Sequence, residues 1–192
     1  MPSISAHMAV AGEVTRRLGL NSDDFIRGNL LPDIIDVTNS HHKVESGAYM
    51  VPDIDYFIEN MEIIGDLKLG YLTHLLLDKH YLEDYLGKIY PGRNIFLDGK
   101  IYIDYDILSY PLMERFGLDV ERLGEILAKY NCKISEEKLK YNIECLKRKK
   151  VGVTNYLDFE SFARFLLEIS KTISKELVNY ASKSGKLRIC IG

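Results

Sequence analysis

The sequence has no segment that approaches the roughly 20 consecutive apolar residues of a membrane-spanning helix. Its first residues, MPSISAHMAVAGEV, contain no basic start, and Glu13, Arg16 and Arg17 arrive before an apolar run of secretory length could form. The absence of both signals predicts a cytoplasmic protein without a transmembrane segment.

Cysteine is also scarce, with only Cys132, Cys145 and Cys190 in the chain. An odd number of widely spaced cysteines suggests neither a disulfide framework nor a CxxC metal site, so we expect free thiols. The chain further lacks a G-x-S-x-G nucleophile elbow, a Cys/His nucleophile arrangement and the adjacent His-Asp pair of HD-type phosphohydrolases. Catalysis by a serine or cysteine nucleophile is therefore not indicated.

The composition that remains is that of a folded protein, with 46% hydrophobic and 28% charged residues among 192. This length suits one compact domain, because two full domains would each be small. We find no internal repeat, low-complexity tract or long linker. We therefore expect a single domain over residues 1–192.

Charge is unevenly distributed along the chain. Residues 1–100 hold 9 Lys plus Arg against 15 Asp plus Glu, whereas residues 101–192 hold 16 against 13. An acidic half of the chain does not favour binding to the negatively charged phosphates of nucleic acids, so no stable nucleic-acid binding is expected. All five histidines lie in this acidic half, at positions 7, 41, 42, 74 and 80, which concentrates imidazoles and carboxylates together.

Helical periodicity dominates the sequence and predicts an all-α fold, an irregular multi-helix bundle. One helix begins at a cap on Asn21 or Ser22 and ends at the breaker Pro32. A last long helix carries an apolar stripe that indicates core packing. The other helices are expected near residues 5–18, 54–63, 66–87, 105–116, 119–130 and 135–148, and the last one near 157–183.

Two segments do not follow the helical pattern. Residues 33–52 are rich in turn formers and predict a loop, a usual place for functional side chains. NIFLDGKIYID, residues 94–104, has Asp98-Gly99 between short β-prone runs and predicts one small β-hairpin inserted into the bundle.

The central helix contains GYLTHLLLDKHY, in which His74 and Asp78 stand four residues apart among leucines. Residues at i and i+4 share a helix face, and a buried carboxylate is costly unless it is paired or coordinates a cation. Either a His–Asp hydrogen bond within the helix or a metal site explains this pair.

Three further stretches supply similar side chains. SAH places His7 on the opening helix, FIRGNLLPD delivers Asp33, and NSHHK contains His41 and His42. Imidazole nitrogens and carboxylate oxygens are ligands that suit zinc and related divalent ions. Together with the central helix, they predict one or two bound Zn²⁺ ions, or other divalent metals in the same place.

The order and spacing of these pieces resemble the bacterial zinc-dependent phospholipase C family, an all-α fold that is shared with some single-strand nucleases. The pattern is His7, then F-x-x-G-x-x-x-P-D, then S-H, then G-Y-x-x-H-x-x-x-D, within residues 1–78. The resemblance implies that one zinc is held by Asp33, His41, His74 and Asp78. It also implies that His7 binds a second zinc and that Asp78 is shared.

His41 fits the S-H step of the family better than His42. The third zinc of the family uses a further histidine and a late H-x-x-x-E, but no histidine follows His80 in this sequence. We therefore expect His42, His80, Glu83 and Asp84 to be additional metal ligands or to contact the ligand side chains.

The resemblance implies a metal-dependent hydrolase of phosphoester bonds, acting on a small-molecule or lipid phosphodiester or phosphomonoester. The expected nucleophile is a metal-bound hydroxide, and Asp33 is the expected catalytic proton acceptor. The alternative is a non-catalytic protein in which metal ions staple a helical scaffold or sensor. Structural zinc sites are often rich in cysteine, however, and none of the three cysteines lies near the cluster in sequence.

Overall fold

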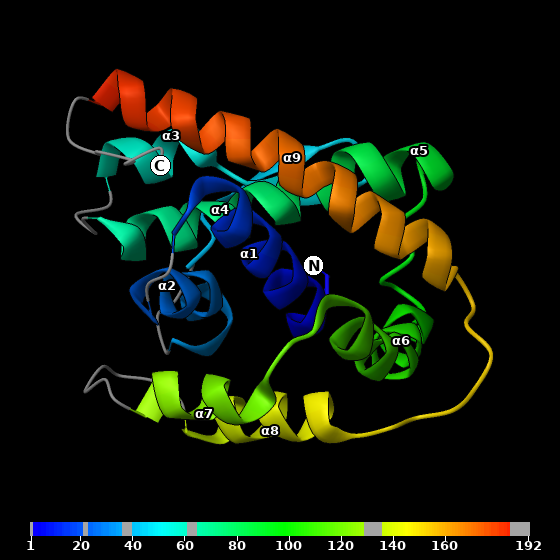
Figure 1. The fold of residues 1–192 in the computed structure, drawn as a ribbon. Helices are drawn as coiled ribbons and strands as arrows, with labels where there is room; N and C mark the ends of the chain where they lie inside the picture. Colours follow the sequence, from blue (N-terminus) through cyan, green and yellow to red (C-terminus); the bar gives the residue numbers. More distant parts are fainter. Residues whose placement is uncertain (1, 21–22, 36–39, 61–64, 129–135, 185–192) are drawn as a thin grey trace.

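The computed structural model describes residues 2–20, 23–35, 40–60, 65–128 and 136–184 (Figure 1). Helices form nearly all of its regular structure, with one two-stranded hairpin, which confirms the all-α fold with a small β insertion. The elements are α1 (Ile4–Leu18), α2 (Asp23–Ile34), β1 (Lys43–Ser46), β2 (Tyr49–Pro52), α3 (Ile54–Asn60), α4 (Asp66–His80), the π-helix η1 (Tyr81–Leu86), α5 (Gly87–Ile89), α6 (Lys100–Phe116), α7 (Val120–Ala128), α8 (Glu136–Lys147) and α9 (Phe159–Ser184). The predicted cap at Asn21 or Ser22, and the thiols of Cys132 and Cys190, lie outside the described residues, while Cys145 is a free thiol.

Helix α1 lies in the middle of the bundle and contacts α9, α6, α2 and α4 (Figure 1). It begins at Ser3, whose side chain caps the helix by accepting a hydrogen bond from the Ala6 amide, and it ends at Gly19 in the left-handed conformation. Its buried side chains are mostly small, so neighbouring helices approach it closely. His7 is completely buried in this central helix, which makes it an exception to its apolar surroundings.

Two glycines allow α2 and α4 to cross at very close range. A Cβ atom added to Gly70 would collide with the carbonyl oxygen of Phe25, and one added to Gly28 would collide with the carbonyl oxygen of Leu67. Both obstacles are backbone atoms, which cannot rotate away as a side chain can. This crossing brings His74, one turn after Gly70, against the backbone of α2.

Helix α2 does not end at Pro32, as the sequence predicted, but continues to Ile34. Proline removes one backbone hydrogen bond, and so close to the end of the helix this loss interrupts little of the ladder. Asp33 therefore lies in the last turn of a helix and not at the start of a loop. Its position is fixed relative to the α2–α4 crossing.

The prediction of a β-hairpin at residues 94–104 is wrong. Residues 95–98 form turns, and α6 begins at Lys100, whose amide donates a hydrogen bond to the Asp98 carboxylate. Ile101, Tyr105 and Leu108 recur at helical spacing on the buried side, and their burial outweighs the local β propensity.

The hairpin of the structure lies instead inside the segment 33–52 that was predicted to be a loop. Ser46 pairs with Tyr49 across a two-residue turn in which Gly47 has a φ of 57°. Tyr49 and Val51 are buried and attach the hairpin to the core. The two strands, of four residues each, were not predicted because the segment is rich in turn-forming residues.

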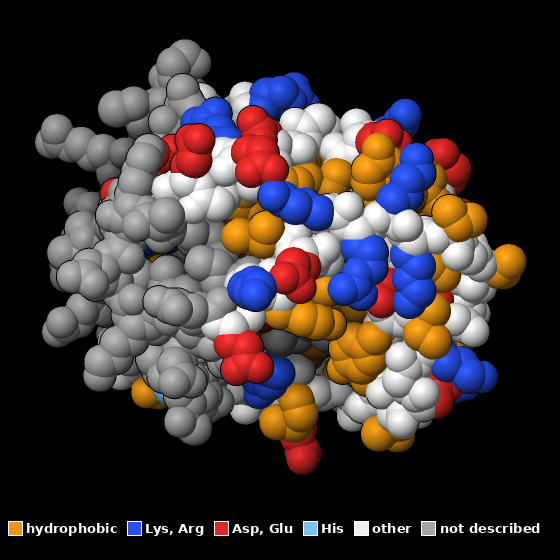
Figure 2. All heavy atoms as spheres, turned by 90° about the horizontal axis from the view of Figure 1, so that it is seen from below, with side chains coloured by type: hydrophobic (Ala, Val, Ile, Leu, Met, Phe, Trp, Pro, Cys, Tyr) orange, Lys and Arg blue, Asp and Glu red, His pale blue; other side chains and the backbone are white. Residues whose placement is uncertain are grey.

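The remaining helical predictions hold over the described residues, with α6 beginning five residues before the predicted start, while residues 61–63, 129–130 and 135 of the predicted helices lie outside the described ranges. The central helix continues from α4 through η1 into α5, and the stripe on α9 is core, with Phe162, Leu166, Ile173 and Leu177 fully buried. Among the described residues, no helix combines the length and apolar character needed to cross a membrane. On the face seen from below in Figure 2, Lys and Arg, Asp and Glu, and hydrophobic side chains lie interspersed.

We predict that Gly70→Ala lowers the free energy of unfolding by about 1 to 3 kcal/mol or more, because the methyl group must push two helix backbones apart. Gly12→Ala is the matched control, since its Cβ atom would meet only a Leu118 methyl carbon at 3.7 Å. Removing that helical glycine should stabilise the protein by up to about 1 kcal/mol. Urea denaturation of both variants checks this, and equal stability of Gly70→Ala and wild type would refute the close crossing.

Candidate metal centre

The structure brings together the five side chains predicted to bind metal. His7 comes from α1, Asp33 from the last turn of α2, His41 from the turn before β1, and His74 and Asp78 from α4. Their ligand atoms form two groups, in each of which all atoms lie within 4.8 Å of one another. The groups are His7, His74 and Asp78, and Asp33, His41 and His74.

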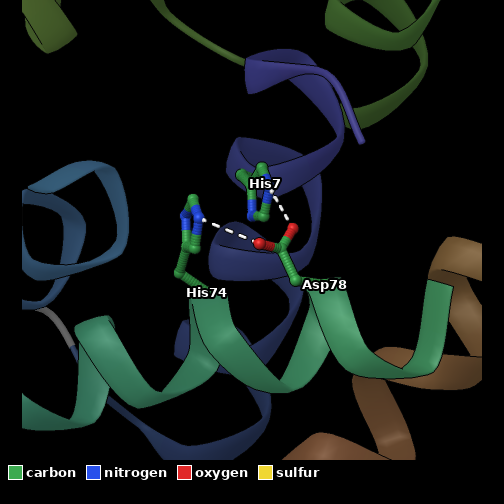
Figure 3. Close-up of side chains that lie close together, drawn as sticks. All are labelled: His7, His74 and Asp78. Atoms are coloured by element: carbon green, nitrogen blue, oxygen red, sulfur yellow. Dashed lines mark ion pairs between the residues drawn. The ribbon is translucent and has the colours of Figure 1, made fainter. Parts of the chain in front are cut away.

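The Asp78 carboxylate is fully buried and turns one oxygen toward His7 and the other toward His74 (Figure 3). Its Oδ1 lies 3.2 Å from His7 Nε2, while its Oδ2 lies 3.3 Å from His41 Nε2 and 3.6 Å from His74 Nε2. Neither oxygen accepts a hydrogen bond of acceptable geometry from the described residues. The predicted pairing of His74 with Asp78 inside the helix therefore does not satisfy this carboxylate.

The protonation of His74 follows from its contact with α2. Its Nδ1 lies 2.7 Å from the carbonyl oxygen of Asn29, which can only accept a hydrogen bond, so Nδ1 carries the proton. Burial lowers the pKa of His74 well below its usual range, and repulsion from His7 lowers it further. The ring is therefore neutral, and Nε2 presents a lone pair to the cluster.

The same argument applies to His41 through Ser40. The Ser40 hydroxyl donates its single proton to the carbonyl oxygen of Pro32 at 2.9 Å, so it accepts a hydrogen bond from His41 Nδ1 at 2.9 Å. His41 therefore turns its Nε2 toward the cluster. The Nε2 atoms of His41 and His74 lie 3.1 Å apart, so a proton or a metal cation must lie between them to prevent repulsion of their lone pairs.

A cation resolves this arrangement, because lone pairs and carboxylate oxygens that converge without donors repel one another. Asp33 Oδ1, His41 Nε2 and His74 Nε2 lie 3.1 to 3.8 Å from one another, and Asp78 Oδ2 lies 3.3 and 3.6 Å from the two imidazoles, although Asp33 and Asp78 do not belong to the same group of ligands. Zinc bonds of about 2.0 to 2.1 Å in tetrahedral geometry place ligand atoms about 3.3 to 3.4 Å apart. The spacing and the N and O donors therefore fit a zinc-sized divalent ion.

The two carboxylates differ in their surroundings. Burial alone would raise the pKa of Asp78, but His74, His41 and His7 outweigh that effect and lower it. For Asp33, burial raises the pKa, His7 opposes the rise and Asp78 adds to it. The Asp33 side chain is 21% exposed, whereas Asp78 is completely enclosed, so Asp33 is the more accessible carboxylate.

His7 occupies a separate corner of the cluster. Its ring stacks on His74, with centroids 3.7 Å apart and planes 7° apart, and neither of its nitrogens makes a hydrogen bond with a described residue. Because Asp78 Oδ1 turns toward His7 and Oδ2 toward His41 and His74, the carboxylate can bridge two ions. This geometry fits the predicted second position, with fewer protein ligands than the first.

The other four candidates lie outside both groups. His42, whose φ of 42° is unusual, stacks on Tyr56 with ring centroids 4.0 Å apart. Glu83 accepts a hydrogen bond from Ser46 at 2.6 Å and so ties η1 to the hairpin. The other two candidates, His80 and Asp84, form a surface network with Glu176 of α9.

In that network His80 Nδ1 lies 2.6 Å from Asp84 Oδ2, and His80 Nε2 lies 3.2 Å from Glu176 Oε2. Burial lowers the pKa of His80, but the hydrogen bonds to Glu176 and Asp84 outweigh it and raise the pKa. Both nitrogens of His80 therefore act as donors to carboxylates, so this cluster joins η1 to α9 and does not resemble a metal site.

Sequence reasoning missed the groups that orient the ligands. The Asn29 carbonyl and the Ser40 hydroxyl fix the tautomers of His74 and His41, and Tyr71 donates a hydrogen bond to the Ser40 carbonyl at 2.6 Å. Ser40 belongs to the S-H step of the motif and Tyr71 to the G-Y step. Their positions in the motif could therefore have indicated that they orient the ligands. A backbone carbonyl such as that of Asn29 leaves no signal in residue identity.

Comparison of the chain with family models, with curated proteins and with solved structures found no match. The resemblance to zinc-dependent phospholipase C therefore rests on the motif residues alone, and the arrangement of those residues in space is an independent observation.

We predict that His41→Ala loses bound zinc, because it removes an Nε2 ligand, whereas His42→Ala retains zinc, because it removes a ring that stacks on Tyr56. The measurement is the zinc content of each purified variant after dialysis against a fixed free zinc concentration. Loss of zinc in His42→Ala alone would reverse the assignment.

Proposed function

We propose that the protein is a zinc-dependent hydrolase of phosphoester bonds, similar in its ligand arrangement to zinc-dependent phospholipase C. The observation that supports this proposal is the group of Asp33, His41 and His74, in which two imidazoles and a partly exposed carboxylate converge. Catalytic zinc sites typically combine three N or O protein ligands with one open position, whereas structural sites are closed.

A divalent ion bound there would polarise a phosphoryl oxygen. It would also lower the pKa of a water molecule, so that hydroxide is available to attack phosphorus near neutral pH. The residues of the chain contribute positioning. Asn29 and Ser40 accept hydrogen bonds from Nδ1 of His74 and His41, which turns the Nε2 atom of each ring toward the cluster. Helix α4 and the α2–α4 crossing fix the relative positions of His74 and Asp33, so the cluster is organised in advance of substrate binding.

Asp33 is the residue of the cluster that reaches a cavity, which makes it the candidate proton acceptor. In hydrolysis, an oxygen of water bonds to phosphorus, the ester P–O bond breaks, and the leaving oxygen takes up a proton. Asp33 would accept the proton that the attacking water loses, and burial raises the pKa of this carboxyl above its usual range.

A second function has one observation in its favour. Apart from Asp33, the ligand side chains are at most 8% exposed, which resembles a closed structural site. A non-catalytic scaffold or metal sensor would need no open carboxylate. The partial exposure of Asp33 next to a cavity favours the hydrolase.

We predict that Asp33→Asn retains the fold and much of the zinc, since the amide oxygen can still coordinate, while hydrolysis slows by about 10²- to 10⁴-fold. The assay is hydrolysis of bis-p-nitrophenyl phosphate by the zinc-loaded protein. Asp24→Asn is the matched control on the same helix, because Asp24 is exposed and lies outside the cluster. Its rate should equal that of wild type.

Full activity of Asp33→Asn would refute the role of Asp33 as proton acceptor. Absence of turnover by zinc-loaded wild type across phosphodiesters, phosphomonoesters and phospholipids would refute the hydrolase and leave the non-catalytic function. His74→Ala provides a contrast, because it should lower zinc content and stability together with the rate.

A further inference from the structure

A cavity of about 620 Å³ lies beside the candidate metal centre, and Asp33 lines it. Pockets that enclose drug-sized molecules have volumes of about 300 to 1,000 Å³. Its other walls come from the start of α1, the β1–β2 hairpin, the segment before α6, α6 itself and α8. On the proposed function, on which this inference rests, the cavity would hold the group that the phosphoester carries.

One wall of the cavity is a continuous chain of aromatic rings. Tyr49 and Phe96 meet edge to face with centroids 6.1 Å apart, Phe96 and Tyr102 lie 6.0 Å apart, and Tyr102 meets Tyr105 edge to face at 6.0 Å. The hydroxyl of Tyr49 donates to the Arg93 carbonyl, so this ring is held in place. Aromatic faces and edges of this kind bind a planar ring better than a flexible chain.

The charged groups of the cavity are few. Lys43 is the only Lys or Arg among the described residues that line it, and it forms no ion pair with them. Asp106, which also lines the cavity, is paired with Lys150 at 3.0 Å. Lys43 is exposed on β1, so its ammonium group is available to an anionic ligand.

We propose that this cavity binds phosphoesters that carry a planar aromatic group. Lys43 contacts the anionic phosphoryl oxygens, and the ring lies against Phe96 and Tyr102. Asp33, at the edge shared with the metal centre, places the phosphorus atom toward the ligand cluster. The aromatic wall thus sets the preference for the group on the ester, and Lys43 contributes to affinity for any such anion.

The test compares phenylphosphonate with methylphosphonate by isothermal titration calorimetry, because neither compound has an ester bond to hydrolyse. Wild type should bind phenylphosphonate at least about tenfold more tightly than methylphosphonate. The titration is carried out with zinc and again with EDTA. Affinity for both compounds should fall with EDTA, but their ratio should persist because the aromatic wall contains no metal ligand.

Two variants separate the two contacts. Tyr102→Leu should weaken phenylphosphonate several-fold and leave methylphosphonate unchanged, whereas Lys43→Gln should weaken both by a similar factor of about ten. The matched controls are Tyr110→Leu on the same helix and Lys100→Gln at its start, neither of which lines the cavity. Both controls should bind like wild type.

Equal binding of the two phosphonates by wild type would overturn the aromatic specificity, and unchanged binding by Lys43→Gln would overturn the role of Lys43. If zinc-loaded protein hydrolyses no ester but retains the phenylphosphonate preference and its dependence on Tyr102, the cavity assignment stands and the proposed hydrolase fails. The two proposals therefore fail separately.

An aromatic phosphoester can carry a nucleobase or a simpler aryl group. Adenosine 5′-thiophosphate, which is hydrolysed slowly, distinguishes these sources in the same titration. Tighter binding than phenylphosphonate supports a nucleoside as the aromatic group, and weaker binding supports a simple aryl group. Both results require the aromatic wall. If neither compound binds, the proposed role of the aromatic wall is overturned.

Discussion

The enclosed carboxylate of Asp78 is the constraint on which the rest of the candidate site depends. Moving an isolated carboxylate out of water costs several kcal/mol, and this one receives no hydrogen bond from the described residues. His74, His41 and His7 lower the pKa of Asp78, but His74 donates its Nδ1–H to the Asn29 carbonyl and therefore turns the lone pair of Nε2 toward the cluster. The interior therefore concentrates electron pairs, and a bound cation would stabilise it.

The fold is arranged so that this concentration can occur. The small side chains of α1 let the helix occupy the middle of the bundle with His7 enclosed. Gly28 and Gly70 let α2 approach α4 closely enough for the Asn29 carbonyl to accept a hydrogen bond from His74 Nδ1. The glycines of the two motif segments thus contribute helix contact, while the histidines and aspartates of the same segments contribute ligands.

Much of this was predictable from the sequence, because burial imposes periodicity. The 3.6-residue repeat identified the helices, and the i, i+4 spacing of His74 and Asp78 identified a shared face. The hairpin was misplaced because Asp98-Gly99 has strong turn chemistry, whereas the burial of Ile101 and Tyr105 that makes the segment helical is a tertiary effect. Orientation of His74 by a backbone carbonyl is likewise a consequence of packing that residue identity does not record.

Asp33 shows the same limit at the site itself. Pro32 correctly indicated that a helix ends nearby, but the two further helical residues place Asp33 on a rigid element and beside a cavity. That placement distinguishes a carboxylate open to a ligand from the enclosed Asp78. Sequence spacing supplied the ligand types, and the packing of α1, α2 and α4 supplied the difference in exposure on which a catalytic role depends.

Metal stoichiometry shows directly whether this cluster holds a divalent ion. Elemental analysis of protein purified without added metal, combined with melting curves in EDTA and in zinc, is the decisive measurement. We expect one or two zinc ions per chain and a higher melting temperature with zinc. A free zinc concentration of about 100 times Kd adds about 2.7 kcal/mol to the free energy of unfolding. A metal-free protein whose melting temperature does not change on addition of zinc would contradict this expectation.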